Sequence, residues 1–402
     1  MLSVCVITKN EERFLKKCLD SVKEIASEII VVDAHSSDQT LKIAEAYTNK
    51  VYSRAWTDDF AAARNFAIEK ATCDWLLFID ADEYLQNASH VIQLLSQTKS
   101  LQVGGFLISR KDKFFHKKDG KLDSYTIGIV RLVRNHPMIK FRNIIHEEIH
   151  SSIENAGLSI KVATTFELVH QVHQYTINQL RKKQISYLRK LNQELSINPD
   201  NYWYQYHRAK TFWFLDKRKK AERNYSNLTN EIDTPLKIRV GAINHLAILF
   251  MESGQDGKAM STINESIKLL QGQSLAYSIK SDLLYTKGRM EEALQLLNKV
   301  NTNLCFCRYE NVVPGDLYQR EDLIQYKKGC IYLATGERRM AEEMFKKGIR
   351  SDPYSVDCYY GLALLFTKYN NLKEAHEKID QCLVLNPEWL DAQVLKEYLV
   401  DV

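Results

Sequence analysis

Proline and glycine are scarce in this chain, with 6 prolines and 15 glycines among 402 residues. Both residue types concentrate in turns and loops, so their scarcity disfavours a loop-rich β protein and favours long helices. Hydrophobic residues make up 45% of the chain and charged residues 26%, which is the composition of a globular protein. A chain of this length usually forms more than one hydrophobic core, and we therefore expect two domains.

Long apolar segments are also missing. No stretch of 18 consecutive apolar residues occurs, so we expect no membrane-spanning helix. The apolar run at the N-terminus is too short for a secretory signal, and no basic segment precedes it. The formal net charge of +5 is compatible with an anionic ligand but does not call for nucleic acid. These absences predict a cytoplasmic protein with neither a membrane nor a nucleic-acid partner.

The eight cysteines form no CxxC pair and have no histidines at zinc-finger spacing. Reduced, buried thiols are the interpretation that this pattern favours. Cys305 and Cys307 are the one closely spaced pair, for which a redox or metal role is the alternative.

Residues 1–175 alternate between strand-like and helix-like segments. We expect strands at Ser3–Thr8, Ser27–Asp33, around Val51, and at Trp75–Ile79, and helices at Glu11–Val22, Ser36–Tyr47 and Asp59–Lys70. This alternation predicts an α/β domain with a Rossmann-like, mainly parallel sheet. Ligands of such sheets bind beyond the carboxyl ends of the strands.

The segment FIDADEYL places three acids, Asp80, Asp82 and Glu83, directly after the apolar strand at Trp75–Ile79. Carboxylates crowded at the end of a buried strand repel one another unless a positive group lies between them. A hard divalent cation would satisfy Asp80 and Asp82 and would also attract phosphates. A single Asp-x-Asp is common by chance, however, and Glu83 is also suited to capping a following helix.

Residues 176–402 are helical throughout, and they contain a repeat. Ala341 and Ala375 are 34 residues apart, as are Pro353 and Pro387. This spacing resembles that of tetratricopeptide repeats, whereas an irregular helical bundle is the alternative. The repeats are expected near residues 197–230, 240–272, 276–300, 320–353 and 354–387, with an insertion at about 301–318. Such a solenoid usually binds a peptide or protein.

Four motifs in order resemble family 2 inverting glycosyltransferases, which have the GT-A fold. They are Val6–Glu11 (VITKNE), Val31–Thr40 (VVDAHSSDQT), Phe60–Ala67 (FAAARNFA) and Phe78–Glu83 (FIDADE). The resemblance implies a sugar-nucleotide donor and a divalent metal, Mg²⁺ or Mn²⁺.

The resemblance also assigns roles to individual residues. The donor would be bound by Thr8, Asn10, Glu11, Asp33, Arg64, Asp80 and Ala81, with the uracil ring at Asp33 and the phosphates at Arg64. The metal would be bound by Asp80, Asp82 and a late histidine, for which His170 is the candidate and His146 and His173 are competitors. For Arg64, a surface ion pair with Asp58 or Asp59 is the alternative.

The segment His146–His150 (HEEIH) supplies candidates for a catalytic base. Glu147 or Glu148, with His146 beside them, could accept a proton, and neighbouring carboxylates tend to have raised pKa values. If the segment is extended, His146, Glu148 and His150 share one face and Glu147 lies on the other. The spacing also fits the HExxH motif of zinc proteases, but that motif needs a helix, and Ile144 and Ile145 favour a strand or loop.

The combination of both parts resembles the sublancin-type peptide S-glycosyltransferases of glycocin bacteriocin biosynthesis, which are dimeric bacterial enzymes. This resemblance implies UDP-glucose as donor, a peptide cysteine as acceptor (with serine left open), and a homodimer. A thiol with its ordinary pKa near 8.5 would need little help from a base. Two alternatives remain: a glycosyltransferase acting on cell-surface or cell-wall glycans, and a non-enzymatic tetratricopeptide adaptor.

Overall fold

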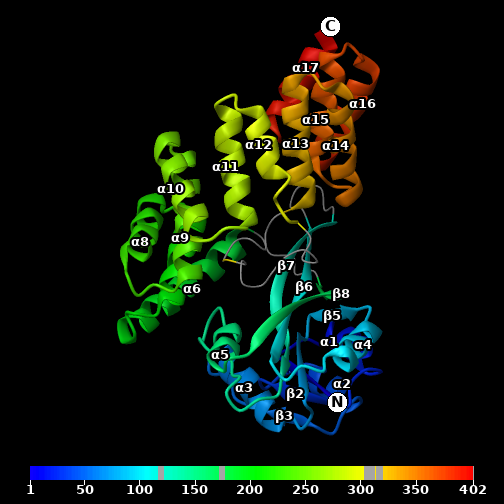
Figure 1. The fold of residues 1–402 in the computed structure, drawn as a ribbon. Helices are drawn as coiled ribbons and strands as arrows, with labels where there is room; N and C mark the ends of the chain where they lie inside the picture. The colour runs from blue at the N-terminus through cyan, green and yellow to red at the C-terminus, as the bar shows by residue number, and fades with distance from the viewer. Residues whose placement is uncertain (116–121, 172–176, 303–312, 314–319, 402) are drawn as a thin grey trace. The chain divides into compact units, whose positions relative to one another are not determined.

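The structure is a computed structural model that describes residues 1–115, 122–171, 177–302, 313 and 320–401 (Figure 1). The chain divides into two compact units. The first consists chiefly of Met1–Phe114 and Ser124–Gln174, and the second chiefly of Tyr175–Asn303 and Asn311–Val402. His173, the cysteines at 305 and 307, and nearly all of the expected insertion at 301–318 lie outside the described residues.

The first unit is built on an eight-stranded mixed sheet. Its strands lie in the order β3-β2-β1-β4-β7-β6-β8-β5. They span Leu2–Thr8 (β1), Glu28–Asp33 (β2), Val51–Ser53 (β3), Trp75–Asp80 (β4), Glu83–Gln86 (β5), Val103–Phe115 (β6), Leu122–Arg134 (β7) and Ser159–His170 (β8). Strands β3, β2, β1 and β4 are parallel, whereas β7 runs antiparallel to β4 and β5 antiparallel to β8. The α/β prediction is confirmed, with a parallel half and a mixed half.

The register of the parallel half brings three polar strand ends together. Thr8 on β1 is the partner of Asp33 on β2, and Ile7 is the partner of Asp80 on β4. The carboxyl ends of neighbouring parallel strands therefore meet at one edge, which is where α/β sheets bind ligands.

Among its described residues, this unit contains the helices Leu15–Val22 (α1), Thr40–Glu45 (α2), Phe60–Lys70 (α3), Ser89–Gln97 (α4) and His150–Asn155 (α5). Helix α1 packs Leu15, Leu19 and Val22 into the core against strand residues such as Val4 and Leu77. Full burial of one such side chain contributes about 1.5–3 kcal/mol. The first two helices are shorter than the sequence predicts because the residues before them form a loop, described below.

The described residues 177–302 and 320–401 of the second unit form helices joined by short connections. After α6 (Ile177–Ile197), consecutive helices pack in pairs (Figure 1). The pairs are Tyr202–Phe214 with Arg218–Asn230 (α7, α8), Leu236–Glu252 with Asp256–Leu269 (α9, α10), Ser274–Thr286 with Met290–Leu297 (α11, α12), Glu321–Thr335 with Arg338–Ser351 (α13, α14), and Val356–Lys368 with Leu372–Leu385 (α15, α16). Helix α17 spans Leu390–Asp401.

Small residues lie where the paired helices cross. An alanine near the start of the second helix of each pair is 0% exposed, namely Ala221, Ala259, Ala293, Ala341 and Ala375. Two glycines make a still closer contact, since a Cβ atom on Gly329 or Gly361 would lie 2.4 Å from Cε1 of Phe345. The sequence repeat thus marks positions where a larger side chain would separate the helices.

None of the described helices is both long and apolar enough to span a bilayer. Six cysteines within the described residues are free thiols, five of them buried and Cys330 half-buried. The expectation of unpaired thiols is borne out for these six.

Candidate active site

Two loops at the carboxyl edge of the sheet are joined by side-chain to backbone hydrogen bonds. The backbone N–H of Asn10 donates to Ser36 Oγ at 2.8 Å, and the side-chain oxygen of Asn10 accepts from the Ser37 N–H at 2.8 Å. The Glu11 N–H donates to Thr40 Oγ1 at 2.8 Å. With the bond from the Glu12 N–H to Asp38 Oδ2 at 3.2 Å, these bonds satisfy the N–H groups of residues 10–12 outside a helix, so α1 begins only at Leu15 and α2 at Thr40.

Asp33 is fully buried between these loops. Its two carboxylate oxygens accept hydrogen bonds from the backbone N–H and the hydroxyl of Ser36, at 2.9 Å and 2.5 Å. Ionised carboxylate oxygens accept more than one bond each, so Asp33 can also accept an N–H of a ligand. Nearby, the buried Thr8 Oγ1 has no partner within the described part of the chain. Thr8 and Asp33 are thus adjacent on neighbouring strands.

Asp80 lies between two arginines. Its Oδ1 is 2.6 Å from Arg64 Nη2 and its Oδ2 is 3.1 Å from Arg131 Nη2. Burial raises the pKa of Asp80, but Arg131 and Arg64 outweigh it, and the net pKa is lowered. The positive groups beside this acid are therefore arginines of the protein itself.

The alternative that Arg64 makes a surface ion pair with Asp58 or Asp59 is wrong. The Arg64 side chain is only 2% exposed, because α3 places it beneath the sheet edge, between Asp80 and Glu147. Sequence analysis also missed Arg131 of β7, a single charge within the apolar run Ile127–Val133. Within the described residues, the buried Nη1 atoms of Arg64 and Arg131 both lack a hydrogen-bond partner.

Glu83 does not cap a helix, contrary to one expectation, because β5 begins at this residue. Its carboxylate is fully buried and accepts the backbone N–H of Asp80 at 3.0 Å, while Arg110 lies 3.5 Å from the other oxygen. Burial and the nearby charge of Asp80 raise the pKa of Glu83 to about 7. Glu83 therefore holds the strand end that carries Asp80 and Asp82.

Asp82 and His170 are in direct contact, although they are 88 residues apart in the chain. Asp82 Oδ2 is 3.0 Å from His170 Nε2, and the other ring nitrogen, Nδ1, is 3.4 Å from Asp112 Oδ1. Arg110 holds Asp112 in turn, with its Nε 2.8 Å from Oδ1. Burial lowers the pKa of His170, but hydrogen bonds to Asp112 and Asp82 outweigh it and raise the pKa to about 10.

Asp82 and His170 fit a divalent cation in part. Across the described residues, no group of three or more His, Cys, Asp or Glu side chains is arranged to bind a metal. Asp80, the third expected ligand, has both oxygens engaged by arginines. A carboxylate oxygen and an imidazole nitrogen in contact form two adjacent positions, and Mg²⁺ sites in proteins commonly take the remaining ligands from substrate phosphates and water.

The segment around Glu147 is a turn, which is the loop rather than the strand of the two forms expected from the sequence. Arg142 and Glu148 pair as an antiparallel bridge, and between them Asn143 and His146 adopt left-handed φ angles of 70° and 52°. Helix α5 begins only at His150. The HExxH alternative is therefore excluded, because the residues from His146 to Ile149 are not helical.

The two adjacent glutamates have different partners. Glu147 Oε1 lies 3.2 Å from Arg64 Nε, which directs this side chain toward Asp80. Glu148 accepts from the backbone N–H of Ser151 at 2.9 Å and lies 3.0 Å from His150 Nδ1, so it caps α5. Burial raises the pKa of Glu148, but these hydrogen bonds outweigh it and the pKa is lowered. The expectation of a raised pKa is wrong for Glu148.

Helix α3 fastens the turn that carries Glu147. The Asn65 side chain donates to the carbonyl of Phe141 at 2.9 Å and accepts from its N–H at 2.8 Å. The Phe60 N–H reaches the carbonyl of Ile144 at 3.3 Å. Arg64 and Asn65 therefore act together, one on the side chain of Glu147 and the other on the backbone before it.

Comparison with known families matches residues 3–154 to Glycosyl transferase family 2 and residues 324–355 to the tetratricopeptide repeat. A TPR repeat-containing protein of Synechococcus elongatus is 37% identical over 152 residues, which cover 38% of this chain and 36% of that one. The SPbeta prophage-derived glycosyltransferase SunS of Bacillus subtilis is 27% identical over 220 residues, covering 54% of this chain and 50% of SunS. The chain thus spans half or less of the length of these relatives.

Among solved structures, the APC/C hetero-tetramer Cut9-Hcn1 covers 55% of this chain and 40% of its own at 14% identity, with a TM-score of 0.46. The thermophilic TPR protein TTC0263 of Thermus thermophilus covers 50% of this chain and 100% of its own at 19% identity, with a TM-score of 0.39.

Proposed function

We propose that the protein transfers a hexose from a UDP-sugar to a peptide side chain, because residues 3–154 match Glycosyl transferase family 2. The similarity to the glycosyltransferase SunS supports glycosyl transfer, and the resemblance to sublancin-type peptide S-glycosyltransferases favours a peptide cysteine thiol of a glycocin-type precursor as the acceptor. UDP-glucose is the donor that we propose. The observation that carries the proposal is the contact between Asp82 and His170 at the carboxyl edge of the sheet, beside the arginine-flanked Asp80.

Donor binding would use both loops at the sheet edge. Thr8, Asn10 and Glu11 line the pocket of the base, and Asp33 accepts the N3–H of uracil. The orphaned Nη1 atoms of Arg64 and Arg131 are donors suited to phosphate oxygens, because a guanidinium that is already held in place loses little freedom on binding an anion. Asp80 and Ala81 would contact the ribose.

Asp82 and His170 would hold a divalent cation, with Asp80 next to it. Such a cation stabilises the negative charge that develops on a departing diphosphate. Asp112 would keep the proton on Nδ1 of His170, so that Nε2 faces the cation as a neutral ligand.

The transfer itself would be a single displacement. The acceptor sulfur forms a bond to C1 of the hexose as the bond from C1 to the diphosphate oxygen breaks, which inverts the configuration and releases UDP. Glu147 is the base that we propose for the thiol proton, since its Oε1 is held by Arg64 and its Oε2 has no partner among the described residues. Glu148 caps α5 instead, and His146 remains a neighbouring candidate.

The decisive experiment is a thermal-shift series with UDP and GDP, each with and without Mn²⁺, on the wild type and on Asp82→Ala. A ligand at about 100 times its Kd adds roughly 2.7 kcal/mol of stability. We expect stabilisation by UDP that requires both Mn²⁺ and Asp82, and mass spectrometry of a cysteine peptide would then detect the added hexose. The proposal fails if neither nucleotide stabilises the protein, or if Asp82→Ala retains most of the transfer activity.

A further inference from the structure

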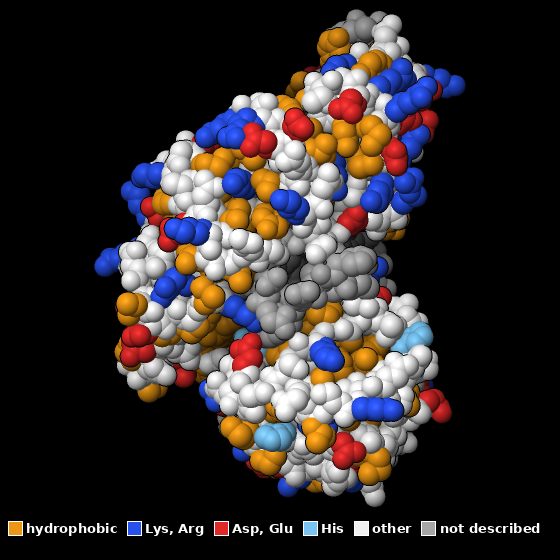
Figure 2. All heavy atoms as spheres, in the orientation of Figure 1, with side chains coloured by type: hydrophobic (Ala, Val, Ile, Leu, Met, Phe, Trp, Pro, Cys, Tyr) orange, Lys and Arg blue, Asp and Glu red, His pale blue; other side chains and the backbone are white. Residues whose placement is uncertain are grey.

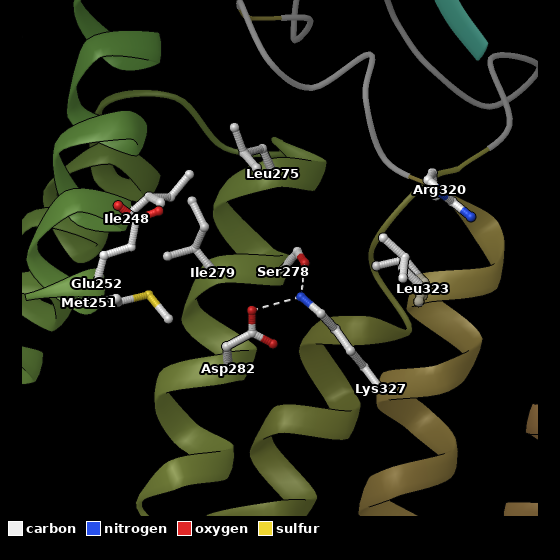
Figure 3. A pocket seen from close by; sticks show the side chains of 11 residues that line it. Ile248, Met251, Glu252, Leu275, Ser278, Ile279, Asp282, Arg320, Leu323 and Lys327 are labelled. Atoms are coloured by element: carbon white, nitrogen blue, oxygen red, sulfur yellow. Dashed lines mark hydrogen bonds and ion pairs between the residues drawn. The ribbon is translucent and has the colours of Figure 1, made fainter. Parts of the chain in front are cut away.

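A cavity lies in the helical unit, far in sequence from the proposed transfer site. It has a volume of about 330 Å³ and is lined by residues of α9, α11 and α13 and by Arg320 just before α13 (Figure 3). These three helices are the first members of successive helix pairs. Figure 2 shows apolar side chains interspersed with charged ones over the helices. The distribution of apolar and charged side chains on this face therefore does not by itself identify a binding site.

The walls of the cavity are aliphatic. They consist of Ile248, Met251, Leu275, Ile279, Leu323 and Ile324. Ile279 and Ile324 are buried, whereas the other four are partly exposed. The lining therefore favours an apolar side chain, for which burial replaces contact with water.

One side of the cavity carries a polar group of three residues. Lys327 Nζ lies 2.7 Å from Asp282 Oδ2 and 2.8 Å from Ser278 Oγ, and Figure 3 shows the lysine reaching across from α13 to α11. Burial raises the pKa of Asp282, although Lys327 beside it acts in the opposite direction. The pair is thus partly screened from water, which strengthens any hydrogen bond made to it.

This polar group has hydrogen-bonding capacity left. An ammonium has three N–H donors, of which two are used by Asp282 and Ser278, and Asp282 Oδ1 accepts no bond from the described residues. The remaining donor and acceptor match the C=O and N–H of a peptide group. The charges of Lys327 and Asp282 balance, so the site favours a neutral ligand over an ion.

The other two charged residues of the lining have partners elsewhere. Arg320 pairs with Asp322 and Asp352, at 2.9 Å and 2.8 Å. Glu252 pairs with Arg218 and accepts a hydrogen bond from Trp213. Both side chains are thus engaged by residues outside the lining of the cavity.

We propose that this cavity docks an uncharged peptide segment of a partner, with one aliphatic side chain between α9, α11 and α13 and a backbone amide against Asp282 and Lys327. The proposal goes beyond glycosyl transfer. Binding here needs neither a sugar nucleotide nor a metal, so it can fail while the transfer function stands, and the reverse also holds. In a peptide-modifying enzyme, the segment would belong to the acceptor.

The test is a titration of peptides into the full chain, without nucleotide. Binding is monitored by NMR of the ¹³C-labelled methionine methyl groups. The Met251 signal is assigned with Met251→Leu. Three capped tripeptides serve as probes: acetyl-Ala-Leu-Ala-amide, acetyl-Ala-Gly-Ala-amide and acetyl-Ala-Asp-Ala-amide. We expect a saturable shift of Met251 with the leucine peptide at millimolar Kd, and at least tenfold weaker binding of the other two.

Variants decide whether the shift reports on the cavity. Leu323→Glu places a carboxylate at a partly exposed position of the lining and should weaken binding of the leucine peptide at least tenfold. Leu275→Gln on α11 should weaken it to a similar extent. Leu269→Glu on α10, at a position that is 40% exposed and outside the cavity, should bind as the wild type does. Circular dichroism checks that each variant is folded.

Three results would overturn the proposal. They are equal binding of the glycine peptide, tighter binding of the aspartate peptide, and leucine-peptide binding that neither cavity variant weakens.

Discussion

At the scale of single residues, three acids within four positions have three different partners. Asp80 is held by arginines, Asp82 contacts His170, and Glu83 accepts the backbone N–H of Asp80. The turn between β4 and β5 directs each side chain to a different neighbour, so the repulsion expected among them is relieved by separate partners.

Asp112 is the residue through which the metal proposal can be tested without measuring transfer. A carboxylate behind a ligating histidine fixes its orientation, and losing it typically costs 10–100-fold in metal affinity. We expect Asp112→Asn to weaken Mn²⁺ binding to the nucleotide-free protein by about that factor, as measured by calorimetric titration.

Lys111→Gln is the matched control for Asp112→Asn, because adjacent residues of a strand point to opposite faces. It should leave the Mn²⁺ affinity unchanged. Equal affinities for the wild type and Asp112→Asn would remove Asp112 from the proposed role.

Glu148 provides a test of stability against pH. Its pKa is lowered in the folded protein, so its carboxylate stabilises the fold above the unfolded pKa, near 4.3, and this contribution is lost as pH falls through the folded value. We expect Glu148→Gln to cost about 1 kcal/mol at pH 7, the typical worth of a helix cap. The difference from the wild type, followed by urea denaturation, should shrink below pH 4. A difference independent of pH would contradict this account.

At the scale of elements, two features show that contacts between elements, more than the local secondary-structure propensity of the sequence, determine the conformation. Helix α3 holds the Glu147 turn through Asn65 and Arg64, which no property of that turn alone would indicate. In the helical unit, Phe345 of α14 lies against Gly329 of α13 and Gly361 of α15, so three helices meet around one aromatic ring.

Gly361→Ala should destabilise the helical unit. The added Cβ would lie 2.4 Å from Phe345 Cε1, and overpacking of this kind costs about 1–3 kcal/mol. Gly257→Ala in α10 is the control, since nothing lies within 4 Å of its Cβ position and alanine is the better helix former by up to about 1 kcal/mol. Denaturant midpoints should therefore move in opposite directions, and a stabilising Gly361→Ala would contradict the close contact.

At the scale of the whole molecule, the chain has separate hydrophobic cores in its two units. We expect scanning calorimetry to resolve two unfolding transitions, because neither core needs the other's residues. UDP with Mn²⁺ should raise only the transition of the unit that contains Asp82, by mass action on its native state. A single transition, or an equal rise of both, would show that the units unfold together.

The sequence by itself determined the order and kind of the elements. Strand ends carrying Asp33 and Asp80 follow from the short apolar runs before them and from the strand–helix alternation, and the 34-residue spacing of alanines marks the helix crossings. These properties depend on neighbouring residues or on regular spacing in the sequence, so they do not require knowledge of the tertiary structure. His170 beside Asp82 was also expected, but only through the family resemblance.

Only the tertiary structure decided which charges meet. Arg131, Arg110 and Asp112 reach the site from β7 and β6, which lie between β4 and β8 in the sheet, and strand order is not visible in any local pattern. Arg110 and Asp112, opposite charges two positions apart on one strand face, were the signal that could have been used. The different partners of Glu147, the proposed base, and of Glu148, which caps α5, likewise depend on two left-handed residues and on a buried arginine 83 positions from Glu147. Pairings of this kind are set by burial, since a buried charge must find the partner that the fold brings to it.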